Sequence, residues 1–250
     1  MTRFLILAAL LSVTAEAQPT NCTVNAGVPP TIRTEGLTEQ IGDVILTCTG
    51  GTPTPAGAPV PQSDITVYLN ANVSSRILSN VNGTAWLDAL ILIDEPHSTY
   101  HPNVPLLACG DPSAPDSVIS PGVCSIIGTG TGVGVYSGAT NRPNVWQGQR
   151  STISSITWLG VPIDGVPSGL SRTIRITNVR VAAPTAMLPA PTPYRVVNMA
   201  ISVGGSHPIA VDAGNTGQPA INNLAFIHCR LLRQWYEYRR AYSAAISLGR

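Results

Sequence analysis

Short segments with alternating apolar and polar residues recur along most of the chain. In residues 172–181, Ile174 and Ile176 fall on one face of an extended chain, and Arg175 and Thr177 fall on the other. A period of two is typical of a half-buried β-strand. Comparable strand-like segments are found at residues 43–49, 64–73, 86–93, 133–136, 151–161 and 194–203. The pattern therefore predicts a chain built mainly from strands.

Helical periodicity is absent between the amino-terminal leader and residue 224. Strands that follow one another without intervening helices pair antiparallel, so the pattern predicts an all-β fold, an antiparallel β-sandwich of Greek-key or jelly-roll type. We expect a single domain of this kind over residues 18–227. Its core is expected to include Val67, Leu69, Leu90, Leu92, Ile174 and Ile176.

Two features interrupt the strand pattern. Near Asn178 the apolar set changes phase, so that Val179 and Val181 join it, and this change predicts a β-bulge. Proline-rich connectors lie at residues 50–62 and 182–193. The same strand character resumes after each connector, so we interpret them as long crossover loops of one domain rather than as linkers between domains.

Residues 1–17 have the features of a secretory signal peptide. Arg3 precedes the short apolar run FLILAALLSV, and the small residues of AEA end the segment. The run is too short to cross a membrane, and no later segment is apolar over a sufficient length. We therefore expect cleavage after Ala17 and a mature protein located outside the cell or on its surface.

The chain has five cysteines, Cys22, Cys48, Cys109, Cys124 and Cys229. Cysteines of exported proteins usually form disulfides, although sequence alone does not fix the connectivity. We favour the two local pairs, Cys22 with Cys48 and Cys109 with Cys124, which leave Cys229 without an assigned role. A zinc site at Cys48 is the alternative, but no C-x-x-C or H-x-x-x-H pattern accompanies that cysteine.

The surface is predicted to be rich in hydroxyl and amide groups and poor in charge. Charged residues make up 11% of the chain, against about 25% in an average protein. All of the basic residues are arginine. Such a surface suits contacts with copies of itself or with neutral polysaccharide, and it offers little to nucleic acid.

The tail, residues 228–250, differs from the rest of the chain. It holds five arginines and one acid, Glu237, for a net charge of +4, and four aromatic residues. One interpretation is a docking helix, in which Leu231, Trp235 and Tyr238 share a face. The other is an appended mobile segment that belongs to no fold. We favour the second, because an isolated helix of this length is marginal in water.

Several stretches, taken together, resemble the amino-terminal β-rich module of large exported surface proteins of soil and hot-spring bacteria. The stretches are EGLTEQIGDVILTCTGGTPT, ITVYLNANVSSRIL, ALILIDEP, SSITWLGVPID and TIRITNVR. The resemblance covers residues 22–203 and consists of strand-and-turn motifs, so it carries over no catalytic residue. It implies a secreted β module of structural or adhesive type.

The stretch IDEPHSTYH is the best candidate for a metal site. It places Asp94, His97 and His101 in a loop after an apolar strand, and these side chains could bind zinc or another divalent ion. The alternative is a solvated loop.

The glycine-rich residues 128–138 lack the spacing of a phosphate-binding loop. They are more typical of a tightly packed or flexible hairpin that another backbone can approach closely.

No pattern in the sequence indicates a catalytic residue or a cofactor, so we do not expect an enzyme. The favoured function is a structural subunit of an extracellular fibre, sheath or surface layer that self-associates through sheet edges. The alternative is a carbohydrate-binding or adhesion module of the cell surface. For that alternative, Trp146 in the stretch RPNVWQGQ, outside the strand-like segments, is the candidate sugar platform.

Overall fold

A computed structural model describes residues 20–95, 104–110, 124–186, 195–205, 209–212 and 220–228. The predicted signal peptide and nearly all of the tail, with Cys229, lie outside these residues. Both therefore stay predictions.

The described residues contain strands, one short 3-10 helix and no α-helix, which confirms the predicted all-β class. The strands are β1 (Thr20–Ala26), β2 (Thr31–Arg33), β3 (Glu39–Gln40), β4 (Val44–Gly50), β5 (Gln62–Leu69), β6 (Asn72–Val73), β7 (Ile77–Val81), β8 (Thr84–Ile93), β9 (Val145–Thr152), β10 (Ser155–Pro162), β11 (Ser171–Thr177), β12 (Arg180–Ala182), β13 (Arg195–Gly204), β14 (Ala210–Asp212) and β15 (Ala220–His228), and the 3-10 helix is η1 (Ala183–Thr185).

Most strands belong to one mixed sheet. Its order is β14-β1-β4-β11-β8-β9-β10-β5-β13-β15-β2, and β7 pairs with β8 beside this path. The pairs β1–β14 and β15–β2 are parallel, and the other pairs in the path are antiparallel. A smaller sheet has the order β3-β12-β6.

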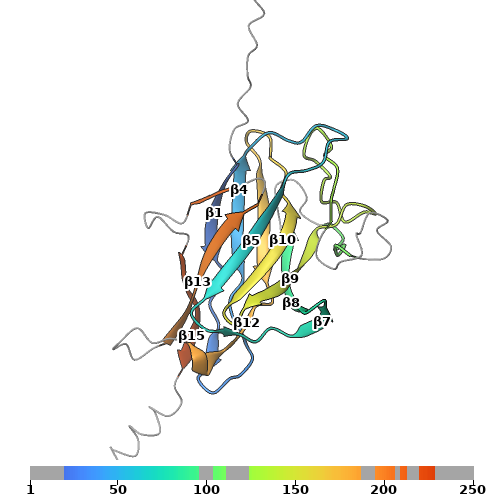
Figure 1. The fold of residues 1–250 in the computed structure, drawn as a ribbon. Coiled ribbons are helices and arrows are strands. Elements are labelled where there is room, and N and C mark those ends of the chain that lie inside the picture. Colours follow the sequence, from blue (N-terminus) through green and yellow to red (C-terminus); the bar gives the residue numbers. More distant parts are fainter. Residues whose placement is uncertain are drawn as a thin grey trace, which may run out of the picture.

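The main sheet curls strongly into a half-barrel around one core (Figure 1). Residues 20–33 contribute to both ends of its path, because β1 pairs with β4 and β2 pairs with β15. The Gly42 N–H also donates to the Leu224 carbonyl at 2.8 Å, which ties the two ends together. The described strands are therefore not clearly divided into the two stacked sheets of the predicted sandwich, and the sheet is mixed rather than purely antiparallel.

The core lies on the concave face of the sheet. Val67, Leu69, Ile174 and Ile176 are buried, as predicted. Leu90 is only half-buried, because the inward set of β8 has the opposite phase. That inward set is Leu87, Ala89, Ile91 and Ile93, each with no exposed area. Leu92 is buried, but it lies on the same face as its partner in register, Arg175.

The phase change near Asn178 is a crossover between the two sheets. Asn178 has a left-handed backbone with φ of 64°. β11 ends at Thr177 in the main sheet, and β12 begins at Arg180 in the small sheet. Val179 and Val181 are buried there. The predicted irregularity is present, but it redirects the chain instead of inserting one extra residue into a strand.

Two disulfides join the cysteine pairs that the spacing favoured. Cys22 and Cys48 are direct register partners on β1 and β4, with their Cα atoms 3.9 Å apart. Cys109 and Cys124 close a separation of 15 residues. Disulfides persist in oxidising compartments, so the protein belongs in an extracellular or periplasmic location.

Candidate functional site

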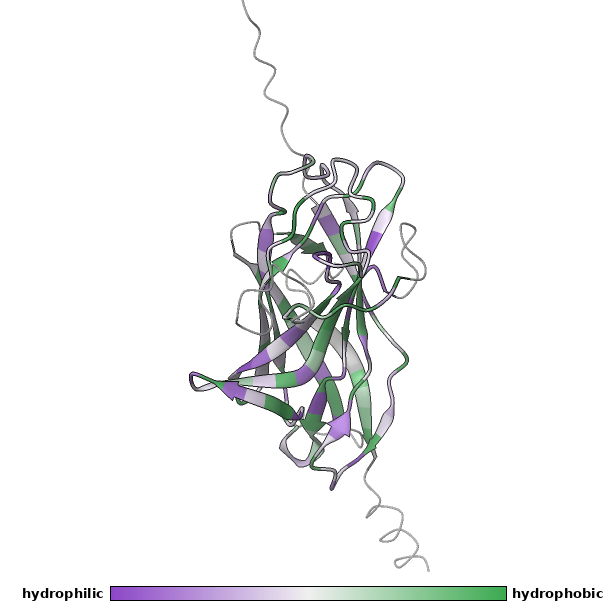
Figure 2. Ribbon diagram, turned by 90° about the vertical axis from the view of Figure 1, so that its right-hand side faces the viewer, coloured by the Kyte–Doolittle hydropathy of each residue, from purple (hydrophilic) through white to green (hydrophobic). Residues whose placement is uncertain are grey.

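The β7–β8 hairpin projects from the body of the molecule and carries an open sheet edge. We call residues 77–87 the arm. Figures 1 and 2 show the arm extending outward from the curled sheet. Among the described residues, β7 pairs with β8 alone, so its other edge has no strand beside it. Such an edge presents N–H and C=O groups that another strand can bind.

The turn of the arm explains why these residues form a hairpin. Val81 pairs with Thr84, which leaves a two-residue loop of Asn82 and Gly83. Both loop residues have positive φ, 50° and 82°. Two-residue loops of this kind match the twist of the strands, and Asn-Gly is their preferred sequence. The tip of the arm is therefore set by local sequence alone.

The base of the arm is fixed by a polar cluster around Asp88. The Arg180 guanidinium forms an ion pair with the Asp88 carboxylate, which also accepts a hydrogen bond from the Arg76 N–H at 2.8 Å. The Asp88 N–H donates to the Arg76 carbonyl at 2.8 Å. Asn178 donates to the Asp88 carbonyl at 2.9 Å and accepts from Arg180 at 3.1 Å. The arm thus leaves the body from an anchored position.

Two neighbouring aliphatic residues are exposed near the base of the arm. Ile77 is 46% exposed and Leu78 is 53% exposed. The β7–β8 register shifts between Ile77 and Ser79, so Leu78 is the extra residue of a bulge. In a regular strand, adjacent side chains point to opposite faces, whereas the bulge leaves both of these side chains in solvent. They add an apolar surface to the open edge.

The other described sheet edges differ from β7 in length and charge. β14 and β2 end the path, are three residues long, and carry Asp212 and Arg33. β3 and β6 flank the small sheet and are two residues long. β7 has five residues, ILSNV, with no charge and no proline. Charges and prolines are what usually prevent edges from pairing, so β7 is the least protected edge in this part of the chain.

Of the three predicted metal ligands, the structure describes only Asp94. His97 and His101 lie outside the described residues, so the metal site stays a prediction. Asp94 is fully buried, and its Oδ2 accepts a hydrogen bond from Arg172 Nη1 at 3.0 Å. In the described ranges no group of three or more His, Cys, Asp or Glu side chains gathers. The Asp94 carboxylate is therefore already held by a cation of the protein itself.

Arg172 organises a buried polar cluster. Its Nη2 donates to the Gly132 carbonyl at 3.1 Å, and its Cζ lies 4.4 Å from the ring centroid of Tyr136. The Tyr136 hydroxyl donates to the Pro162 carbonyl at 2.5 Å and accepts from the Asp164 N–H at 2.9 Å. Burial raises the pKa of Tyr136 above its ordinary value, and the Arg172 charge opposes this shift. These interactions hold loops in place and are closed to solvent.

The glycine-rich residues 128–138, which we call the cap, pack against this cluster. A Cβ atom at Gly128 would lie 2.6 Å from the Thr54 carbonyl oxygen, and Gly132 has φ of 70°. The cap thus needs glycine both for close backbone approach and for its left-handed turns. The expected close approach of another backbone is present, but residues 133–136, which were expected to form a strand, form a turn.

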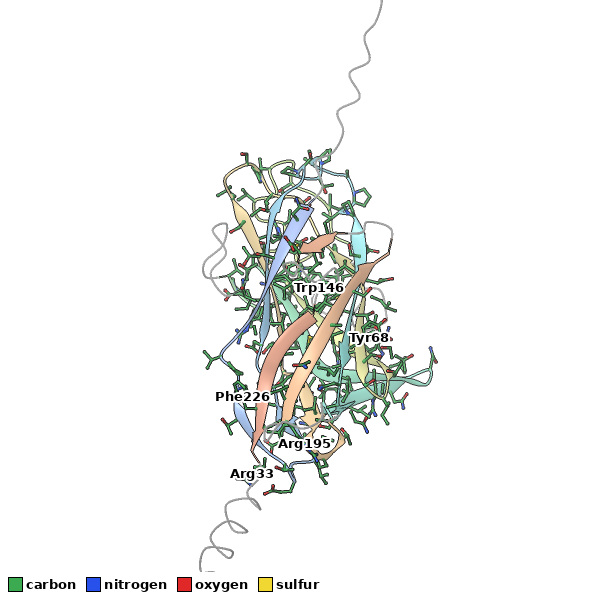
Figure 3. The ribbon with its side chains drawn as sticks, turned by 90° about the vertical axis from the view of Figure 1, so that its left-hand side faces the viewer. Arg33, Tyr68, Trp146, Arg195 and Phe226 are labelled. Carbon is green, nitrogen blue, oxygen red and sulfur yellow. A yellow bond between two sulfur atoms is a disulfide. The ribbon has the colours of Figure 1, made fainter. Side chains whose placement is uncertain are left out.

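Trp146 cannot serve as a sugar platform, because its side chain has no exposed area. Its ring packs edge-on against Tyr136, with centroids 6.0 Å apart. On β9, the buried Trp146 and Gly148 alternate with the half-buried Gln147 and Gln149, so Trp146 belongs to the face that packs on the core. The aromatic residues that are exposed among those described are Tyr68 at 50% and Phe226 at 38%. In Figure 3, Trp146 lies inside the body, and Tyr68 and Phe226 lie on either side of β13.

A cavity of about 380 Å³ lies between the end of β4 and the turn before β11. Hydroxyl groups of Thr49, Ser168 and Ser171 line it, together with glycine and aliphatic residues. Because no ionisable side chain lines it, the cavity offers no acid or base for catalysis. Within the described ranges, no helix has the length and apolar character needed to span a membrane.

β7, the first strand of the arm, was not among the predicted strands, although a local signal for it is present. Asn82 and Gly83 stand between two short segments of strand-forming residues, the strongest short-range indication of a hairpin. The first of these segments, ILSNV, has too little alternation to be recognised by periodicity alone.

Comparisons with protein-family models and with curated proteins find no match for this chain. The resemblance of residues 22–203 to bacterial surface proteins therefore stays an expectation from the sequence.

Proposed function

We propose that the protein is a secreted structural subunit that self-associates, and that the arm is its main contact. The observation that carries this proposal is the uncharged edge of β7, which pairs with no other strand than β8 among the described residues. The favoured assembly is an extracellular fibre, sheath or surface layer. Two disulfides and a charge content of 11% fit a protein that functions outside the cell in close contact with its own copies.

A second copy is the partner that suits β7 best. An added strand would satisfy the outward N–H and C=O groups with main-chain hydrogen bonds. The contact would also cover Ile77 and Leu78, and burying an aliphatic side chain fully contributes about 1.5–3 kcal/mol. The two- and three-residue edges of β2, β3, β6 and β14 are too short to cover β7.

The arm of the second copy is the edge that matches β7 in length. Two β7 strands can pair antiparallel across a two-fold axis, so that the same residues of both copies take part. Such a contact joins subunits in pairs, and a larger assembly adds a second contact elsewhere. We therefore expect a dimer to be the first species that forms as the concentration rises.

Sedimentation velocity of the mature protein from residue 18 tests this function. We expect the wild type to associate with rising concentration and the Leu78→Lys variant to stay monomeric, because a charge at an edge opposes pairing. Val28→Lys is the matched control, since Val28 is exposed on the loop between β1 and β2. It should associate like the wild type. A wild type that is monomeric at all concentrations, or a Leu78→Lys variant that associates fully, contradicts the proposal.

A further inference from the structure

The outer face of the sheet carries an exposed tyrosine with small neighbours. Tyr68 on β5 pairs in register with Ala200 on β13 and with Ser155 on β10. Side chains of register partners lie side by side on one face. Alanine and serine have short side chains, and Tyr68 is 50% exposed. Figure 3 shows Tyr68 at the surface of the sheet.

A chain of hydroxyl groups runs beside this ring. Thr66 Oγ1 lies 3.0 Å from Thr157 Oγ1, which donates to Ser151 Oγ at 3.0 Å. Ser151 Oγ lies 2.8 Å from Ser155 Oγ, which lies 2.6 Å from Thr152 Oγ1. The β9–β10 register shift makes Ser151 an extra residue, and this bulge brings its hydroxyl into the chain.

The hydroxyl groups differ in exposure along the chain. Ser151 and Thr152 are exposed, Thr66 is half-buried, and Thr157 and Ser155 are buried between them. Gln149, the register partner of Thr157, continues the polar row with an amide. We call Tyr68, Ala200 and the five linked hydroxyl residues the Tyr68 patch. The patch contains no charged side chain, so it offers nothing specific to an anionic or cationic partner.

We propose that the Tyr68 patch binds a neutral polysaccharide. A pyranose ring presents C–H groups on one face, which can stack on the exposed tyrosine ring, and hydroxyl groups at its rim. Hydroxyls both donate and accept hydrogen bonds, so the exposed Ser151 and Thr152, which the buried Ser155 and Thr157 hold in place, can match the sugar rim. An apolar partner would leave these hydroxyl groups without water, and an anionic chain would find no arginine in the patch. This site is separate from the arm and does not depend on self-association.

Affinity electrophoresis of the mature protein tests the site. The gels contain laminarin, hydroxyethylcellulose or soluble starch as neutral probes, and alginate as the anionic probe. We expect retardation by at least one neutral probe and none by alginate. The Tyr68→Ala variant should lose about tenfold in affinity, as expected for a central aromatic contact. Tyr68→Phe keeps the ring and should stay within about threefold of the wild type.

Two further variants separate the site from general effects. Phe226→Ala removes the other exposed aromatic side chain and should leave retardation unchanged. Ala200→Gln places a longer side chain beside the Tyr68 ring and should weaken binding as Tyr68→Ala does. Melting followed by circular dichroism verifies that each variant is folded. Retardation by no neutral probe, preference for alginate, or equal retardation of the wild type and folded Tyr68→Ala and Ala200→Gln variants overturns the proposal.

Discussion

The cap and the arm differ in where they place charge and in whether their backbone is enclosed. Beside the cap, Arg172 and Asp94 form a fully buried ion pair, and the Gly132 carbonyl of the cap accepts a further hydrogen bond from Arg172. At the arm, five residues without charge form a strand with one open edge. Charges thus lie where they fix loops. The β7 edge has none, although charged residues usually prevent such an edge from pairing.

This contrast separates two roles that a sheet protein must combine. Buried charges are costly unless they are paired, so the cap can adopt few alternative arrangements. An open strand edge is satisfied by water in the monomer and by another strand in a complex, so the arm can exist in either state. The cap therefore serves the stability of the subunit, and the arm serves its proposed association.

Removal of the buried cation beside the cap should have the largest effect. In Arg172→Met, the Asp94 carboxylate stays buried without its guanidinium partner. We expect a loss of about 3–5 kcal/mol in the free energy of unfolding, measured by urea denaturation. Arg33→Met, at an exposed arginine on β2, should change it by less than about 0.5 kcal/mol. Equal stability of the two variants would show that the buried pair does not secure the cap.

Loss of the disulfide between β1 and β4 should come next. The Cys22→Ser/Cys48→Ser variant frees a crosslink over a separation of 26 residues. We expect it to lose about 2–4 kcal/mol of unfolding free energy, mainly because the unfolded chain becomes less restricted. The bridge between Cys109 and Cys124 closes a shorter separation and should contribute somewhat less. A larger loss from this second bridge would mean that it also fixes native loops.

The pH dependence of stability should report on Tyr136. Its folded-state pKa is raised by burial, so below the unfolded value of about 10 its contribution is fully present. Above about pH 10 the unfolded chain loses this proton first, and the free energy of unfolding falls. Relative to Tyr136→Phe, the wild type should lose about 1.4 kcal/mol more per pH unit. An unchanged slope in Tyr136→Phe contradicts this assignment.

The arm variants should have the smallest effect on the monomer. Ile77 and Leu78 are about half exposed, so replacing either with lysine should change the free energy of unfolding by less than about 0.5 kcal/mol. Urea denaturation at low protein concentration measures this quantity without association. A loss of more than about 1 kcal/mol would mean that the arm packs on the body, and would weaken the contrast with the cap.

Local sequence patterns predicted the positions of the strands better than they predicted which strands pair. The period of two correctly placed Ile174 and Ile176 in the core, since burial on one face follows directly from alternation. It failed for Leu90, because β8 is apolar on both faces and the sequence does not show which set points inward. Trp146 lies outside the predicted strand-like segments, although it belongs to β9 and is buried.

Distant pairings had no local signal. β2 and β15 pair in parallel although they lie at opposite ends of the domain sequence. Arg172 and Asp94 are 78 residues apart, so their pairing depends on the register of β8 and β11. The open edge of β7 likewise follows from which strands pair elsewhere. Edges and buried ion pairs are properties of the assembled sheet rather than of any segment.

Hydrogen–deuterium exchange of the mature protein at low and high concentration tests the proposed contact most directly. Residues 76–88 contain the arm and its base, and residues 155–162 of β10, which lie between two strands, provide the internal reference. The account predicts that amides of β7 become protected as the protein associates, while those of β10 do not change. Unchanged exchange in β7, in a sample that sedimentation shows to be associated, would contradict it.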